Sequence, residues 1–542
     1  MKGRTTNWSR ARRAAKRMLD PTYSLKSFYD DCLASFPELL LYGADDGGLV
    51  SSGRSSMEEY QRTMGALFAV FWFMRRKMGG AESFCFGVDD EWEPLNARSK
   101  QPRRKKEEIA KRQTFFNEVE WERIDELLHD AGLLCDGVQG HDEERVLAML
   151  VLTAIHDIMK LVPLLPTVAP DHAPYRGYKV GETIHDHDIA LSYVLDHYSY
   201  ALPSYHELSK KQQDSIRFTQ CKMEYNMGWL VQAEAPPGAL FTKFKECMED
   251  GGVEPADVAF YFCHWLTDLA GAEPYPQEGC EKFVLKFPRT VLSSFIKSFK
   301  IVGELAVKSE SQVLEDYLVW RWTSHQPSLG VVPGDRGSIA ALRLVVMAQG
   351  DSQAILRALT TVPLQDRDVL EDELAHTGCK EQLFELENFP EGTVPMGPAI
   401  LIYYAPALMQ KAGKSDPSSA MRILAEIFRQ ARQLWPMLPS SAGTVVTVRI
   451  DVLKELEVKL ITAATPGEVW ALEKTSSRDA EVKKVSLGSE ALSQAFLAGN
   501  KVRMLNFTKM PYNNSIGMKG IQTTWRKKES KSQNLDAGSS RF

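Results

Sequence analysis

Histidine and aspartate gather in one part of this sequence, in combinations that could bind metal ions. Nine of the eleven histidines lie between positions 129 and 264, which is about a quarter of the chain. Imidazole nitrogens and carboxylate oxygens are common ligands of divalent metals. The concentration indicates a metal site, a histidine-rich pocket or a proton-handling cavity between His129 and Asp268.

Two apolar segments carry side chains that a hydrophobic environment should exclude. His156 and Asp157 interrupt the apolar run 151–161, and Asp268 lies in the apolar run 256–270, one turn after His264. An ionised carboxylate buried in such a helix costs several kcal/mol unless it is paired or bound to a cation. We therefore expect a cation to hold these groups, with His156, Asp157 and Asp268 as its ligands.

The motif Ile155-His156-Asp157-Ile158-x-Lys160 resembles the core motif of the HD-domain metal-dependent phosphohydrolases. The resemblance covers about residues 116–280. It implies a first ligand on the preceding helix, where His129 lies, and a final aspartate, for which Asp268 is the candidate. It also implies a lysine that contacts phosphate, here Lys160. The pair His185 and His187 could supply a further ligand or contact the substrate.

The same resemblance implies a function. Two divalent ions (manganese, iron, magnesium or zinc) would activate water to hydrolyse a small-molecule phosphate ester, such as a nucleotide or cyclic nucleotide. His187 or His264 would protonate the leaving oxygen. Two alternatives stay open: an HD-like di-iron oxygenase, which would use the surplus of histidines, and a non-catalytic helical scaffold or ligand-binding protein.

The elements that must position these residues are mostly helices. Apolar residues recur at helical spacing over 118–134, 143–164, 188–200, 213–231 and 256–270, whereas 444–450 alternates like a strand. We expect a mainly α fold with an HD-like helical core and a small α+β part near the C-terminus. The expected divisions are an N-terminal helical region with a basic linker (1–115), the metal-binding domain (116–330), a helical and mixed region (331–524) and a disordered basic tail (525–542).

Composition and charge narrow the choice of partners. The net charge of −6 gives no overall attraction to nucleic acid, which we do not expect as a partner. The apolar run 65–73 is too short to span a membrane. Scattered cysteines without a CxxC pair favour a reduced, cytoplasmic protein. The basic residues in 1–19 leave nuclear or organellar targeting open, and the N- and C-terminal regions could bind other proteins.

Overall fold

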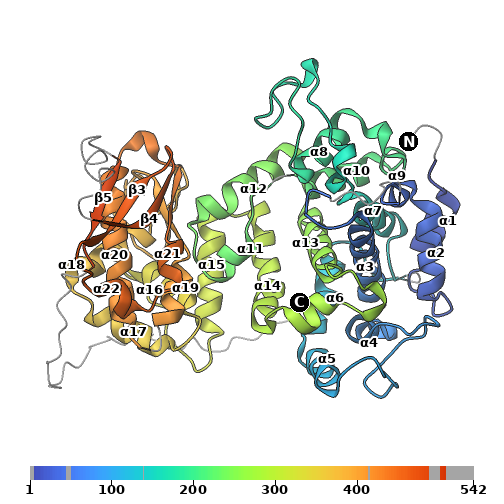
Figure 1. Cartoon of the computed structure of the whole chain (residues 1–542), viewed down its shortest axis with the longest axis horizontal. Coiled ribbons are helices and arrows are strands. Elements are labelled where there is room, and N and C mark those ends of the chain that lie inside the picture. Colours follow the sequence, from blue (N-terminus) through green and yellow to red (C-terminus); the bar gives the residue numbers. More distant parts are fainter. Residues whose placement is uncertain are drawn as a thin grey trace, which may run out of the picture.

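The computed structural model describes residues 5–43, 50–137, 140–221, 223–412, 415–486 and 501–507. Figure 1 shows two lobes joined through helices near the middle of the chain. The larger lobe is helical, and the smaller one combines helices with a sheet. The chain is therefore mainly α with a small α+β part, as the sequence predicts.

Fifteen of the helices in the described residues form the larger lobe and the part that joins it to the smaller lobe. They are α1 (Trp8–Lys16), α2 (Leu25–Ser35), α3 (Ser56–Met74), α4 (Gly80–Phe86), α5 (Lys106–Glu118), α6 (Trp121–Asp130), α7 (Glu143–Ile155), α8 (His187–His197), α9 (Pro203–His206), α10 (Lys210–Thr219), α11 (Met227–Val231), α12 (Pro237–Gly251), α13 (Pro255–Ala270), α14 (Arg289–Gly303) and α15 (Glu310–Thr323).

Helices α3, α7 and α13 form the centre of this lobe, and α3 contacts both of the others. Each begins at a recognisable signal: a capping box at Ser55, an aspartate N-cap at Asp142, and a proline in the first turn of α13. Helices α3 and α13 approach closely where Gly65 meets Gly271. A Cβ on Gly271 would lie only 2.1 Å from the backbone nitrogen of Ala66, so only glycine fits there.

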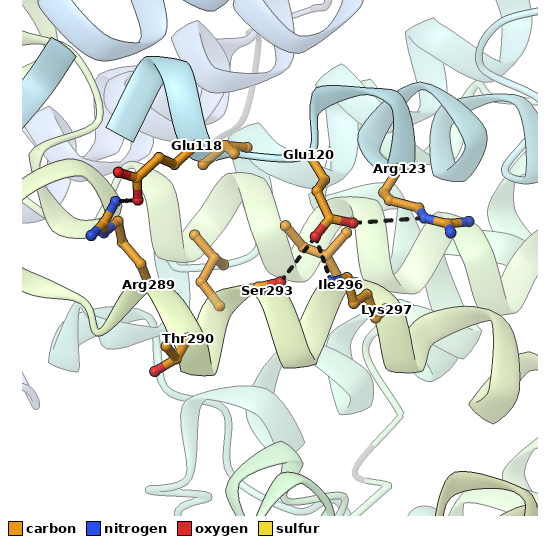
Figure 2. Close-up of a pocket in the computed structure, with 10 residues that line it drawn as sticks. Glu118, Glu120, Arg123, Arg289, Thr290, Ser293, Ile296 and Lys297 are labelled. Carbon is orange, nitrogen blue, oxygen red and sulfur yellow. Dashed lines mark hydrogen bonds and ion pairs between the residues drawn. The ribbon is translucent and has the colours of Figure 1, made fainter. Parts of the chain in front are cut away.

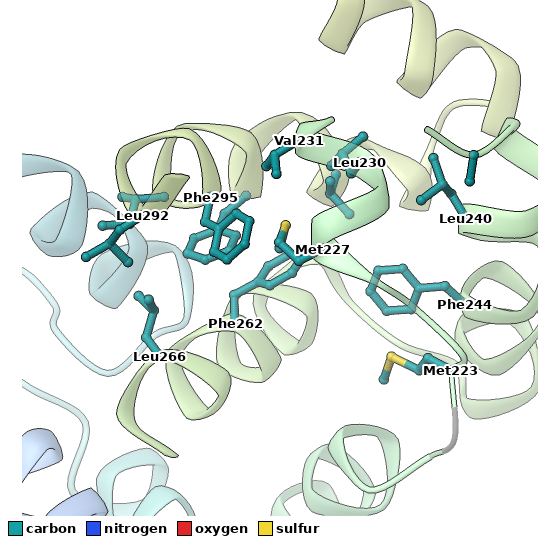
Figure 3. Packing of buried hydrophobic residues seen from close by; sticks show 14 of the residues in the cluster. Met223, Met227, Leu230, Val231, Leu240, Phe244, Phe262, Leu266, Leu292 and Phe295 are labelled. Atoms are coloured by element: carbon teal, nitrogen blue, oxygen red, sulfur yellow. The ribbon is translucent and has the colours of Figure 1, made fainter. Parts of the chain in front are cut away.

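Aromatic and aliphatic side chains hold α13 against α14 and the short helix α11. Figure 3 shows Phe262 and Leu266 of α13 facing Leu292 and Phe295 of α14, with Met227 of α11 beside them. All five side chains are buried. This apolar contact fixes the position of α13, the helix that carries Asp268.

The smaller lobe contains a five-stranded sheet among the described residues, with strand order β1-β2-β4-β3-β5. Strands β1, β2 and β4 are parallel, and β3 is antiparallel to both β4 and β5. Helix α20 contacts β1, β3 and β5. The strands are β1 (Ala399–Tyr403), β2 (Val445–Arg449), β3 (Glu468–Lys474), β4 (Asp479–Ser486) and β5 (Val502–Leu505), and the helices are α16 (Ser338–Ala348), α17 (Ser352–Thr361), α18 (Leu364–Leu374), α19 (Ala405–Ala412), α20 (Pro417–Leu434), α21 (Asp451–Lys454) and α22 (Val458–Thr462).

The expected linker before residue 115 is part of the larger lobe. Helix α5 occupies much of it, and Arg112 is fully buried, donating to the carbonyl oxygens of Cys85 and Glu278 and pairing with Glu281. Because α3 also contacts α7 and α13, residue 115 does not separate two packing units. Charge alone suggested a solvated segment, but these carbonyl oxygens satisfy the guanidinium inside the fold.

Two further expectations concern the length of the helix that begins at residue 143 and the C-terminal tail of the chain. The helix expected over 143–164 ends at Ile155, and a short 3₁₀ turn, η3 (Ile158–Lys160), follows it. The expected tail 525–542 lies outside the described residues. None of the helices in the described residues has the length and hydropathy needed to cross a membrane.

Candidate functional site

His156, Asp157 and Asp268 converge at the ends of α7 and α13. The Nε2 atom of His156 lies 2.8 Å from Oδ1 of Asp268 and 3.4 Å from Oδ2 of Asp157. Each residue offers one ligand atom, and these atoms all lie within 4.8 Å of one another. Ligand atoms that share one ion at about 2.1 Å lie roughly 3 Å apart, so the donor set fits a divalent metal.

The backbone of α7 orients the imidazole of His156. His156 is the residue directly after the last turn of α7, and its Nδ1 lies 2.8 Å from the carbonyl oxygen of Thr153. A carbonyl oxygen only accepts, so Nδ1 carries the proton and donates it. Nε2 is then the nitrogen that faces the carboxylates, which is how metal-bound histidines are commonly held.

The two carboxylates change the protonation of His156. Burial alone lowers the pKa of His156, but Asp157 and Asp268 outweigh it and raise the pKa to about 9. Burial acts to raise the pKa of Asp268, whereas the charge and hydrogen bond of His156 hold it well below its usual range. Without a metal, the imidazole is therefore a cation between two carboxylates at neutral pH.

Lys160 and Glu59 extend the cluster on its buried side. The Nζ atom of Lys160 lies 2.6 Å from Oδ2 of Asp157 and 3.5 Å from Oε2 of Glu59. Glu59, in the first turn of α3, is fully buried and also accepts from Arg62 and Ser52. Lys160 thus lies beside the expected ligand Asp157, and its charge is shared between two carboxylates.

His187 and Asp188 lie at the more exposed edge of the cluster. Nε2 of His187 is 4.0 Å from Oδ1 of Asp157 and 3.5 Å from Oδ1 of Asp188. Both residues belong to the first turn of α8, which is capped by Asp186. His185 precedes the helix and is exposed, so the structure brings His187 to the cluster and leaves His185 outside it.

His264 contacts the cluster through its ring. It lies one turn before Asp268, and its ring centroid is 4.9 Å from that of His156 in an edge-to-face arrangement. Burial and the neighbouring His156 lower the pKa of His264 to about 3. The ring is therefore neutral at neutral pH, which argues against the expected role of His264 as a proton donor.

His129 does not join the group, contrary to the expectation for a first ligand. It occupies the last turn of α6, where Leu127 and Leu128 are buried and His129 is exposed. Each residue turns the side chain by about 100° around a helix, so the step from Leu128 to His129 moves it off the buried face. The distance between His129 and His156 in the sequence suits a pair of ligands, but the side chain of His129 lies on the exposed face of α6.

Glu59 and Asp188, two neighbours of the cluster, are not among the predicted site residues. Glu59 gave a usable signal, because it is an acid near the start of an apolar helix, the same pattern that identified Asp268. Asp188 directly follows the predicted site residue His187, at a helix N-terminus where its charge is favourable. Neither position in the sequence indicates proximity to Asp157, which arises from the packing of α3 and the placement of α8.

A well-formed cavity of the larger lobe lies elsewhere. It has a volume of about 490 Å³ and lies between the α5–α6 junction and α14. Figure 2 shows its charged side chains paired with one another: Arg289 with Glu118, and Lys297 and Arg123 with Glu120. Because the charges are mutually neutralised, this cavity offers no free ionic group to a ligand.

Comparison with known proteins places the chain in a family without assigning it an activity. Neither the curated proteins nor the solved structures include a match to this sequence. Residues 133–431, more than half of the chain, match a family of unknown function, DUF6829. The matched segment contains His156, Asp157 and Asp268, whereas Glu59 and His129 lie before it. The chain belongs to the DUF6829 family.

Proposed function

We propose that this protein binds a divalent metal ion through His156, Asp157 and Asp268 and hydrolyses a small-molecule phosphate ester. The observation that carries the proposal is the convergence of one imidazole nitrogen and two carboxylates within 4.8 Å of one another. The fixed tautomer of His156 supports it further, because Nε2 is left as the coordinating nitrogen. This group supplies donors for one ion, rather than the two that the HD-domain resemblance implies.

The surrounding residues suit a phosphate substrate. A divalent ion at this position would lower the pKa of a bound water and polarise a phosphoryl oxygen. Lys160 would offset negative charge on the phosphate from the buried side. The side chain of Asp268 is 43% exposed, so the group is accessible from solvent. This combination of a cation, a buried ligand set and an open edge favours an anionic substrate.

His187 is the residue best placed to handle a proton. Its side chain is 35% exposed and faces Asp157 from the edge of the cluster. His264 is unsuited to that role, since it is buried and its lowered pKa keeps it neutral. We therefore assign protonation of the leaving oxygen to His187.

The competing functions make different demands on the site. A di-iron oxygenase would require several histidine ligands, whereas the described group contains only His156. The exposed positions of His129 and His185 disfavour that alternative. A non-catalytic protein would instead use the same residues as an ion-pair cluster, in which Lys160 and protonated His156 neutralise the acids.

Elemental analysis of the purified full chain tests the metal. We expect about one transition-metal ion per chain after incubation with manganese and desalting, because a multidentate site retains its ion. Asp157→Asn should retain less than about 0.2. His129→Ala is the matched control and should retain the ion, because His129 lies outside the group.

Activity is measured on the metal-loaded chain with a panel of nucleotides, cyclic nucleotides and simple phosphate esters. Phosphate or nucleoside monophosphate release that disappears in Asp157→Asn, but not in His129→Ala, is the expected result. Metal retention without turnover of any ester would leave the site as a metal centre and refute the hydrolase. Wild-type protein without bound metal would refute both the metal site and the hydrolase and would favour the ion-pair cluster.

A further inference from the structure

Two cysteines far from the metal-binding group lie in direct contact. Cys221 follows the C-terminal end of α10, and Cys247 lies in α12. Their sulfur atoms are 2.7 Å apart, and both residues are thiols. The two segments are held together by stacking of Phe218 on Phe244, with ring centroids 6.0 Å apart. This contact packs the two segments that carry the cysteines against each other.

The separation of the sulfur atoms identifies the chemistry that they could share. Two thiolates on one zinc ion, each bound at about 2.3 Å, would lie roughly 3.8 Å apart in a tetrahedral site. A disulfide requires about 2.05 Å. The observed 2.7 Å is too short for a shared metal and needs a shift of less than an ångström to form the covalent bond. The geometry favours a dithiol that can become a disulfide.

Cationic side chains make Cys221 the more reactive partner. Nη2 of Arg176 lies 3.6 Å from its sulfur. The hydrogen bond from Cys247 and the charge of Arg176 outweigh burial and lower the pKa of Cys221 to about 6, while the same contact raises the pKa of Cys247. The thiolate is the nucleophilic form of cysteine. Cys221 is thus ready to react, and Cys247 is positioned to resolve the product.

Small molecules can reach the pair. Cys221 and Cys247 line a cavity of about 480 Å³ that also includes Arg176 and Arg217. Cys221 is partly exposed, whereas Cys32, Cys85, Cys263, Cys280 and Cys379 are buried. An oxidant can therefore approach Cys221 from solvent without unfolding of the lobe.

We propose that Cys221 and Cys247 form a site of reversible oxidation by hydroperoxides. The Cys221 thiolate attacks the terminal peroxide oxygen, the O–O bond breaks, and the leaving alkoxide or hydroxide takes a proton from solvent. The resulting sulfenic acid is attacked by the sulfur of Cys247, which forms the disulfide and releases water. Two thiols and one hydroperoxide thus give one disulfide, one alcohol or water from the leaving group, and one further water.

Peptide mapping of the full chain after treatment with one equivalent of hydrogen peroxide tests the proposal. We expect a Cys221–Cys247 cross-linked peptide that dithiothreitol removes. Before oxidation, Cys221 should react with iodoacetamide at pH 7 roughly tenfold faster than Cys135, the exposed reference thiol. Cys247→Ser should stop the reaction at a sulfenic acid on Cys221, which dimedone captures.

The wild-type map decides the question even if a variant fails to fold. Oxidation of Cys135 without any Cys221–Cys247 cross-link would overturn the proposal. So would equal alkylation rates for Cys221 and Cys135, because Cys221 would then lack the expected thiolate. Cys135→Ser should leave the cross-link unchanged.

Discussion

The two ends of the α7–α13 pair are both joined by buried charges, yet they differ in chemistry. Arg145 and His156 are eleven residues apart in the sequence, as are Asp257 and Asp268. Eleven residues make about three helical turns, so each pair lies on one face of its helix. Arg145 meets Asp257 at the first end, and His156 meets Asp268 at the second.

At the first end, protein groups accept hydrogen bonds from all three guanidinium nitrogens. The guanidinium of Arg145 donates to the carbonyl oxygens of Ala131 and Ala256, to the hydroxyl of Ser215 and to Asp257. Arginine stays protonated and cannot ligate a metal. This end therefore serves to align the helices.

The second end brings carboxylates together around a residue that can lose its proton. His156 can either pair as a cation or coordinate as a neutral ligand, whereas Arg145 can do only the first. An ion pair with a buried cation occurs at each end, so burial of charge alone does not identify a metal site. Whether a metal can bind depends on which types of residue converge.

The largest expected effect comes from removing the arginine of the first end. Arg145→Met should destabilise the chain by about 3–5 kcal/mol, because Asp257 and the carbonyl oxygens lose a buried partner. Urea unfolding in the presence of a chelator measures this change. Arg123→Met, at an exposed ion pair, is the control and should change stability by less than about 0.5 kcal/mol. A similar loss in both variants would contradict the aligning role.

Manganese should stabilise the chain only through the second end, where His156, Asp157 and Asp268 converge. At a free manganese concentration of 100 times the dissociation constant, the wild type should gain about 2.7 kcal/mol in unfolding free energy. His156→Ala should gain nothing under the same conditions, and His129→Ala should behave like the wild type. If manganese stabilised His156→Ala as much as the wild type, the metal would have to bind at another site.

A smaller effect is expected where α3 crosses α13. Gly271→Ala places a Cβ against the backbone of Ala66 and should cost about 1–3 kcal/mol. Gly303→Ala, whose added Cβ meets open space, is the matched control and should be neutral or slightly stabilising. Thermal unfolding compares the two variants, and a neutral Gly271→Ala would mean that the helices can separate without cost.

Per pH unit, the smallest effect is expected from the titration of His156, with opposite signs for stability and metal affinity. The pKa of His156 is raised to about 9, so its stabilising proton is present below about pH 6.5 and lost as the pH rises through 9. In chelator, unfolding free energy should fall over this range by at most about 1.4 kcal/mol per pH unit. Manganese affinity should rise by at most about tenfold per unit, because the ion displaces that proton.

Chemical denaturation with and without manganese at a series of pH values measures both trends. The His156→Ala variant should lose the fall in stability together with the metal response. Parallel trends for stability and affinity in the wild type would contradict the competition between the proton and the metal.

Patterns within single segments predicted the mainly α fold class and three residues of the candidate site. His156, Asp157 and Asp268 were identified because each interrupts an apolar helical run, and burial makes an isolated charge costly. The strand β2 was recognised from its alternation. The choice of Lys160 followed from the HD-domain resemblance; its Nζ pairs with Asp157, and its contact with phosphate stays a prediction. Each of these predictions depends on residues close together in the sequence.

Predictions that depended on the relation between segments fared worse. His129 lies at a suitable sequence distance from His156 but on the exposed face of α6. The charged segment around Arg112 was expected to be solvated, and its partners at Cys85 and Glu278 are invisible in the local pattern.

The sequence by itself determined that the fold is mainly helical and that α7 and α13 each carry charged side chains in an apolar setting, because helical periodicity and the cost of burying charge are local properties. Only the tertiary structure decided which charges meet. Packing of α3 brings Glu59 to Lys160, and packing of α10 against α12 brings Cys221 to Cys247. Such encounters depend on interhelical packing over long sequence separations, which no single segment encodes.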